Sequence, residues 1–186
     1  MDKIIRGRAW VVRDGAGNPI ENIDTDMIFH NKHLAITDIG EMGQHAFGNL
    51  EGWRDFPKKA QKGDILVVGK NFGAGSSRQQ AVDCFIALGI RAIIGESFGA
   101  IYFRNAVNAG LPILEAPGIA SAEIASGDEI EIEAATGAVR NITRDAQLPP
   151  AKPVFSIQRE IIEAGGLLEL ARKILGDEIS KTPGTG

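Results

Sequence analysis

The clearest pattern in the chain is an alternation of short apolar runs with amphipathic stretches between residues 64 and 114. Three apolar runs predict strands buried on both faces, at residues 65–68, 91–94 and 111–114. Helices are expected between them, at residues 76–88 and 100–109, and Gly89 and Gly110 stand where each helix would end. Such a βαβαβ unit forms a parallel sheet with right-handed crossovers.

The flanking segments predict a first strand, an antiparallel hairpin and a C-terminal helix, at residues 6–12, 128–143 and 157–174. Acidic and apolar residues alternate over 128–133, which is typical of a half-exposed strand, and Gly165-Gly166 should bend the helix. Residues 40–62 show no regular pattern. We therefore expect one α/β domain over residues 1–175, with a parallel core and a second, antiparallel β layer, and a flexible tail at residues 176–186.

Composition narrows the class of protein. The chain has 186 residues, a net charge of -4 and a single cysteine, and its pI is about 5.4. The acidic balance argues against nucleic-acid binding, and no apolar run approaches the roughly 20 residues that span a bilayer. One cysteine permits no internal disulfide, and the N-terminus lacks the apolar segment of a signal peptide, so we expect a cytoplasmic protein.

A glycine-rich loop, residues 69–75, follows the first of the three buried strands at its carboxyl end, where α/β folds bind ligands. Its glycines, including Gly75, let the backbone approach a ligand closely. Two hydroxyls and a guanidinium follow directly, on Ser76, Ser77 and Arg78. Because a guanidinium can hold a carboxylate by two hydrogen bonds, the stretch predicts an anion site with a hydroxyl held against it.

A purely structural interpretation of Ser76 is also open. Ser76 and Gln79 have the spacing of a capping box, and a serine before a helix commonly only caps it. The loop does not end in Gly-Lys-Ser/Thr as a Walker A loop does, and Arg78 occupies the third glycine position of Gly-x-Gly-x-x-Gly. The pattern alone leaves capping and anion binding as alternatives.

Three separated motifs together resemble one family: residues 22–28 (NIDTDMI), 69–78 (GKNFGAGSSR) and 95–106 (GESFGAIYFRNA). Over about residues 6–170 the chain resembles the aconitase family, in particular the small subunits of 3-isopropylmalate dehydratase and homoaconitase and the mobile C-terminal domain of aconitase. The resemblance implies a three-layer swivelling β/β/α domain. It also implies the small subunit of a hydro-lyase that isomerises a hydroxy-dicarboxylic acid by dehydration and rehydration.

The resemblance also implies roles for site residues. It assigns the catalytic base to Ser76 as an alkoxide, a substrate hydrogen bond to Ser77 and a grip on a substrate carboxylate to Arg78. The second aspartate of the first motif, Asp26, lies in the family's active site, where it would orient the serine and arginine cluster. From the residues alone, Asp24 and Asp26 could equally be turn formers.

In the resembled family, the loop at residues 29–38 reaches over the substrate and helps to select it. Homoaconitase-like members, and some isopropylmalate enzymes, carry an arginine after a Tyr-Leu pair, whereas this chain has His33-Leu34-Ala35. The change favours a substrate with an apolar γ-group over one with a third carboxylate. His30 and His33 lack a clear third metal ligand, so we expect solvated side chains and no metal site, with Lys32 or His33 contacting a substrate carboxylate.

The resembled enzymes need a [4Fe–4S] cluster, which several cysteine thiolates hold. Cys84 is the only cysteine and belongs to an apolar helix face, so we expect it in the core and the cluster on a large partner subunit. The leading candidate activity is that of 3-isopropylmalate dehydratase, in leucine biosynthesis. Homoaconitase and a 2,3-dimethylmalate-type dehydratase are rivals, and a non-catalytic phosphate-binding module is the alternative from another class.

Overall fold

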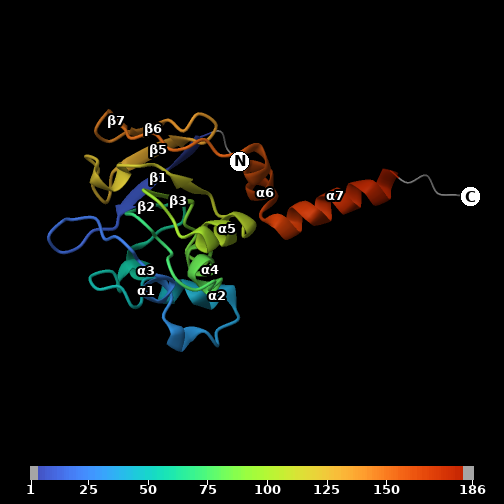
Figure 1. The fold of residues 1–186 in the computed structure, drawn as a ribbon, viewed down its shortest axis with the longest axis horizontal. Coiled ribbons are helices and arrows are strands. Elements are labelled where there is room, and N and C mark those ends of the chain that lie inside the picture. Colours follow the sequence, from blue (N-terminus) through green and yellow to red (C-terminus); the bar gives the residue numbers. More distant parts are fainter. Residues whose placement is uncertain (1–3, 182–186) are drawn as a thin grey trace, which may run out of the picture.

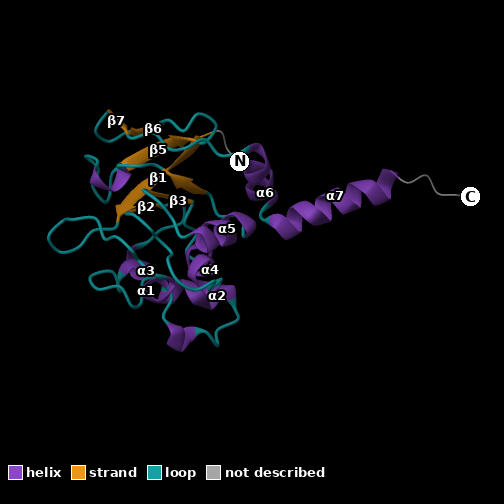
Figure 2. Ribbon diagram, in the orientation of Figure 1, coloured by secondary structure: helices purple, strands orange, loops and turns teal. Residues whose placement is uncertain are grey.

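The computed structural model describes the backbone of residues 4–181 and the side chains of residues 4–176. Its strands form one seven-stranded sheet in the order β4-β3-β2-β1-β5-β6-β7 (Figures 1 and 2). The first four strands pair in parallel and the last three join them antiparallel. The strands are β1 (Ile4–Val11), β2 (Ile65–Val68), β3 (Ala92–Gly95), β4 (Ile113–Glu115), β5 (Glu129–Glu133), β6 (Val139–Asn141) and β7 (Ala146–Leu148).

Helices cover one face of the parallel strands and form most of the connections between strands (Figure 2). The α-helices are α1 (Thr25–Ile28), α2 (Ile39–Met42), α3 (Phe56–Lys59), α4 (Gln80–Ala87), α5 (Ala100–Asn108), α6 (Ser156–Ala164) and α7 (Leu167–Lys181). Three short 3-10 helices accompany them, η1 (Asn31–His33), η2 (Gly43–His45) and η3 (Ile119–Ser121). Residues 40–62, which gave no regular pattern, thus fold into short helical turns.

Two apolar cores lie on opposite faces of the parallel strands. One core joins the helices to the sheet and includes Leu66, Phe85 and Ile93. The other includes Ile65 and Val67 and packs against the apolar face of the antiparallel strands; its members there are Ile130, Ile132, Val139 and Leu148. The predicted α/β class with a parallel core is confirmed. The antiparallel layer is continuous with the parallel one, because β1 pairs with both β2 and β5.

Most boundaries of the central unit lie within two residues of the predicted ones, but the start of one helix differs by four. β2 occupies residues 65–68, and Gly89 follows the end of α4 with φ of 73°. The start of that helix was predicted at Ser76 and is wrong, because α4 begins at Gln80. Its N-terminal cap, Gln79, makes no side-chain capping bond, so no capping box forms. Ser76 lies in the preceding loop.

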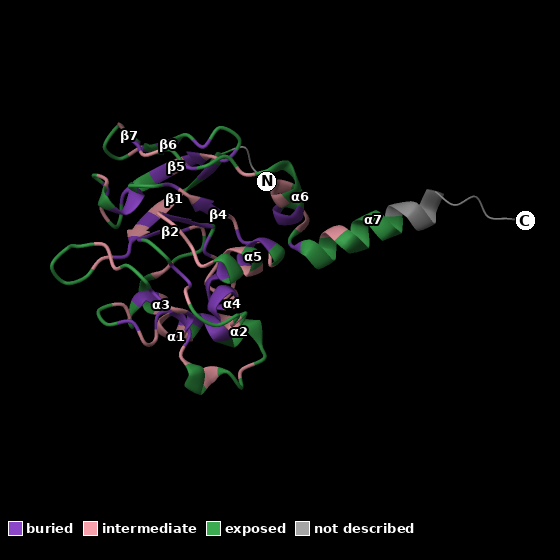
Figure 3. Ribbon diagram, in the orientation of Figure 1, coloured by how far each residue is buried: buried purple, intermediate pink, exposed green. Residues whose placement is uncertain are grey.

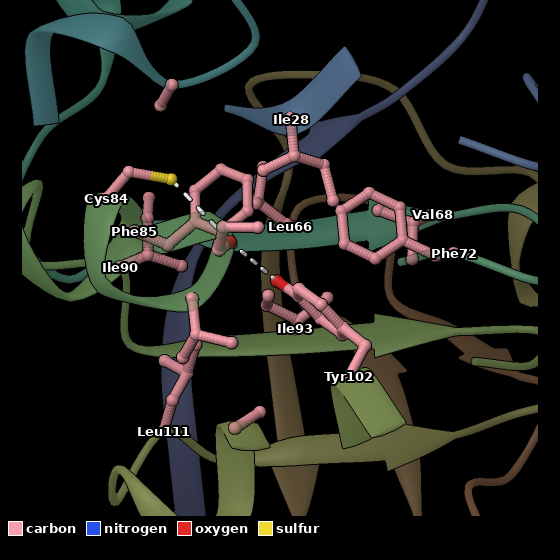
Figure 4. Packing of buried hydrophobic residues seen from close by; sticks show 14 of the residues in the cluster. Ile28, Leu66, Val68, Phe72, Cys84, Phe85, Ile90, Ile93, Tyr102 and Leu111 are labelled. Atoms are coloured by element: carbon pink, nitrogen blue, oxygen red, sulfur yellow. Dashed lines mark hydrogen bonds between the residues drawn. The ribbon is translucent and has the colours of Figure 1, made fainter. Parts of the chain in front are cut away.

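Helix α4 buries Cys84 in the core, as predicted. The Cys84 thiol and the Tyr102 hydroxyl both donate to the carbonyl oxygen of Ala81, at 3.6 and 3.2 Å (Figure 4). Burial raises the pKa of Cys84 well above its usual range. The thiol is therefore a packed group within α4, and the Tyr102 hydroxyl links α5 to α4.

The predicted C-terminal helix is two helices. Gly165 and Gly166 adopt φ of 86° and 126° and separate α6 from α7, which projects from the body (Figure 3). Helix α7 runs to Lys181, so residues 176–181 of the expected tail are helical, and 182–186 lie outside the described residues. Within the described part of the chain, no helix is long and apolar enough to cross a membrane.

A buried carboxylate fastens β1 to the start of β2. Asp64, 3% exposed, accepts hydrogen bonds from Arg8 Nη2 at 2.8 Å and from Trp10 Nε1 and the backbone N–H of Gln61, both at 2.7 Å. Burial alone would raise the pKa of this carboxyl group, but these donors outweigh burial and lower it. The fold therefore stabilises the ionised carboxylate of Asp64.

We expect Asp64→Asn to lower the free energy of unfolding by about 3 kcal/mol at pH 7, since Arg8 is left without its charged partner. The pKa of Asp64 is depressed in the fold, so this contribution is present above the unfolded carboxyl pKa of about 4 and is lost as the pH falls further. Urea unfolding of both proteins between pH 7 and pH 2 measures the difference, which should shrink below pH about 4. The exposed Asp55→Asn serves as control, with an expected change below about 0.5 kcal/mol.

Candidate active site

The loop after β2 is fastened to the chain segment that leads into α1. The backbone N–H of Gly73 donates to the carbonyl oxygen of Ile23 at 2.7 Å, and that of Thr25 donates to the carbonyl oxygen of Ala74 at 2.9 Å. Asp24 caps α1 through hydrogen bonds from two backbone N–H groups. This pairing places the first two sequence motifs side by side.

The third motif, residues 95–106, is hydrogen-bonded to the glycine-rich loop. Phe72 donates its N–H to the carbonyl oxygen of Ser97, and Gly99 donates to that of Phe72. Gly73 has φ of 75°, and a Cβ atom there would lie 2.1 Å from Cγ of Tyr102. The loop therefore approaches α5 so closely that only glycine fits, and all three motifs meet at the end of the parallel strands.

Ser76 lies exposed in this loop, beside a buried threonine. The hydroxyl oxygens of Ser76 and Thr25 are 3.0 Å apart, and either can donate. Thr25 is 3% exposed. Of the two alternatives for Ser76, capping is therefore wrong, because the cap position of α4 is Gln79 and the Ser76 hydroxyl contacts Thr25.

Arg78 and Asp26 form the charged part of the site. Nη1 of Arg78 donates to Asp26 Oδ1 at 2.9 Å and to the carbonyl oxygens of Phe29 and Thr25 at 2.6 and 3.3 Å. The hydrogen bond from Arg78, aided by the N–H of Asn31, lowers the pKa of Asp26 against the opposing effect of burial. Among the described residues, Nε and Nη2 of Arg78 have no hydrogen-bond partner, so that edge of the guanidinium can receive a carboxylate.

The two remaining residues predicted in this loop, Gly75 and Ser77, precede and follow Ser76 in the sequence. Gly75 has φ of 96°, and a Cβ atom there would lie 3.7 Å from Oγ1 of Thr25. Ser77 is exposed, and its carbonyl oxygen accepts a hydrogen bond from Asn105 Nδ2 at 3.3 Å. No described group bonds the Ser77 hydroxyl, which leaves it open to a ligand.

The loop predicted to select the substrate projects below α1 in Figure 1. His33 is half-buried: its ring stacks on His45 with 3.8 Å between centroids, which corrects the expectation of a solvated side chain. Burial, and then the neighbouring His45, lowers the pKa of His33, so it is neutral at pH 7. Leu34 and Ala35 are exposed. None of these three bonds to the serine loop within the described chain.

Three contacts of the site have no signal in the sequence pattern. Thr25 reaches Ser76, Asn105 holds the Ser77 carbonyl, and Asn49 donates to Asp26 Oδ2 at 3.0 Å. Asn49 comes from the irregular segment that periodicity left unassigned. Each contact joins residues distant in sequence, which a local pattern does not reveal.

Metal ligands are not gathered in the described part of the chain. No group of three or more His, Cys, Asp or Glu side chains there could hold a metal ion. Cys84 lies in the core, bonded to Ala81. These residues do not fit an iron–sulfur cluster.

Comparisons with known proteins agree on one family. The model of the aconitase C-terminal domain matches residues 18–117, which contain all three motifs. The 3-isopropylmalate dehydratase small subunits of Pyrobaculum calidifontis and Pyrobaculum aerophilum are 45% and 47% identical, over 89% and 88% of this chain and 96% and 94% of theirs. The isopropylmalate/citramalate isomerase small subunit of Methanocaldococcus jannaschii is 42% identical over 95% of this chain and 99% of its own length.

A solved structure has the same fold. The crystal structure of 3-isopropylmalate dehydratase from Methanocaldococcus jannaschii matches with a TM-score of 0.82 and 34% sequence identity. The match covers 96% of this chain and 99% of that one. Its fold is therefore shared along nearly the whole length.

Proposed function

Because the chain belongs to the aconitase C-terminal domain family, we propose that it is the small subunit of a hydro-lyase interconverting 2-isopropylmalate and 3-isopropylmalate, a reaction of leucine biosynthesis. The observation that carries this proposal is the cluster of Ser76, Arg78 and Asp26, assembled from segments 52 residues apart. The near full-length similarity to 3-isopropylmalate dehydratase small subunits supports it. A cytoplasmic location belongs to the same proposal.

The reaction removes a proton from a carbon beside a carboxylate and a hydroxyl group from the neighbouring carbon. Deprotonated Ser76 Oγ takes the proton: the C–H bond breaks and its electron pair forms the double bond. The C–O bond breaks at the same time, and its electron pair leaves with the hydroxide, which a Lewis acid on the partner chain would accept. Rehydration returns the proton from Ser76 and places the hydroxyl on the other carbon. Arg78 holds a substrate carboxylate through Nε and Nη2 while Asp26 fixes the guanidinium.

A second, cluster-bearing chain belongs to this proposal. A [4Fe–4S] cluster on the large subunit would supply the Lewis acid for the leaving hydroxyl. Residues 1–175 would act as one swivelling domain against that subunit, with residues 176–186 as a tail. The alternative phosphate-binding module loses support, since α4 begins beyond the serines and Asp26 already pairs with Arg78.

We expect the isolated chain to be colourless and inactive, because the described residues offer no cluster ligands. Anaerobic co-expression with its large subunit should yield a brown complex that isomerises isopropylmalate. Iron content, visible absorbance and turnover measure this. Near-stoichiometric iron on the single chain would contradict the proposal that the large subunit holds the cluster. Tight phosphate-ester binding by the single chain would favour the phosphate-binding module.

Ala35 should favour an apolar γ-group on the substrate. Without an arginine there, a third carboxylate lacks an ion-pair partner worth about 10- to 150-fold in kcat/KM. We expect isopropylmalate to be preferred over homocitrate and cis-homoaconitate, which carry a third carboxylate, and Ala35→Arg to narrow the gap. Thr37→Arg, with the same charge elsewhere on this exposed loop, is the control. Faster turnover of either tricarboxylate by the wild type would refute the inference.

A further inference from the structure

The Ser76 hydroxyl has one hydrogen-bond partner among the described residues, the hydroxyl of Thr25 at 3.0 Å. Thr25 has no other side-chain partner there and is buried. Its backbone is held on both sides, since its N–H donates to Ala74 and its carbonyl oxygen accepts from Phe29 and Arg78. A β-branched side chain on a fixed backbone has few rotamers, so the hydroxyl is already aimed at Ser76.

A serine that acts as a base must hold negative charge on its oxygen, and other sources of stabilisation in this loop are weak. Arg78 makes no hydrogen bond to Ser76, and its pairing with Asp26 offsets much of its charge. The N-terminus of α4 lies at Gln80, four positions beyond Ser76 in the sequence. A direct donor is therefore needed, and Thr25 is the one that the site supplies.

We propose that Thr25 is a positioning residue that donates its hydroxyl hydrogen to the deprotonated Ser76 oxygen and stabilises that form. The inference rests on the proposed role of Ser76 as base. When Ser76 takes the substrate proton, it acquires an O–H group and the hydrogen bond can reverse, with Thr25 accepting. No proton leaves Thr25 at any stage. A preorganised donor of this kind needs no reorganisation during the reaction.

The test uses the enzyme assembled with its large subunit and compares Thr25→Val with Thr25→Ser. Valine keeps the shape of threonine and removes the donor, whereas serine keeps the hydroxyl. We expect Thr25→Val to lower kcat/KM at pH 7 by about 10- to 100-fold, the worth of a hydrogen bond to a charged group. The rising limb of the pH profile should move upward by about one to two pH units, because the Ser76 alkoxide is less stable. Thr25→Ser should return the limb toward its wild-type position.

Three outcomes would overturn the inference. They are a wild-type profile in Thr25→Val, an equal loss in both variants, and a loss that is uniform across pH. If Thr25→Val does not assemble, Thr25→Ala provides the same comparison with a smaller side chain. Ser76→Ala distinguishes the role of Ser76 from that of Thr25. If Ser76→Ala stays active, the proposed base is wrong. If it is inactive and the Thr25→Val profile is unshifted, only the role of Thr25 is refuted.

Discussion

Replacing Ser76 by alanine should lower the turnover of the assembled enzyme by at least about 10²- to 10⁴-fold, the usual effect of removing a general base. The protein should still fold, because Ser76 is exposed and caps no helix. Losing its bond to Thr25 should reduce the free energy of unfolding by only about 1 kcal/mol. Turnover, urea unfolding and co-elution with the large subunit measure these three properties separately.

Ser77→Ala is the matched control, since it removes a neighbouring hydroxyl that no described group bonds. We expect it mainly to raise KM, as a substrate hydrogen bond is lost. Turnover within tenfold of wild type in Ser76→Ala would leave the proposed mechanism without its base.

Gly73→Ala should destabilise the fold by about 2 to 5 kcal/mol and inactivate the enzyme. Two effects add: alanine is strained at φ of 75°, by about 1 to 2 kcal/mol, and its Cβ would lie 2.1 Å from the buried ring of Tyr102. The ring cannot yield easily, since Tyr102 is 1% exposed. The loop would have to move, and Ser76 with it. Urea unfolding and turnover of the assembled enzyme measure the two effects.

Gly17→Ala separates the two contributions. Gly17 has a similar φ of 88°, but nothing lies within 4 Å of its Cβ position. The control should therefore show the backbone strain alone, about 1 to 2 kcal/mol, with full activity. If Gly73→Ala were no less stable than this control, close packing against Tyr102 would not be what fixes the loop.

Elements whose signals are local could be predicted from the sequence. The β2 apolar run and the glycine after α4 depend on neighbouring residues, and both lie where expected. The start of α4 was misplaced because a capping box is also a local signal, and here a tertiary contact to Thr25 overrides it. β7 (Ala146–Leu148) was missed because three residues are too few for an alternation to stand out.

The residues of the site also differ in whether the sequence reveals them. The motif residues Asp26, Ser76 and Arg78 were identified together only through the family resemblance. In the structure Arg78 bonds to Asp26, and Ser76 bonds to Thr25, the residue before Asp26. Asn49 could not be found, because it comes from a glycine-interrupted segment without periodicity and meets Asp26 across 23 residues. The solvation of His33 was predicted wrongly since its partner, His45, lies on another turn.

The long sequence separations within the site also shape how the protein folds. The Ser76–Thr25 and Arg78–Asp26 contacts each close a loop of about 50 residues, and β1 must pair in parallel with β2 across the same span. Loop-closure entropy is unfavourable until such contacts form, so non-local pairings of this kind slow folding. During synthesis, the serine loop cannot pair with residues 24–26 until Arg78 has left the ribosome. Contacts that form after the folding transition state chiefly slow unfolding. The cluster that performs the chemistry would therefore also lower the unfolding rate of the native state.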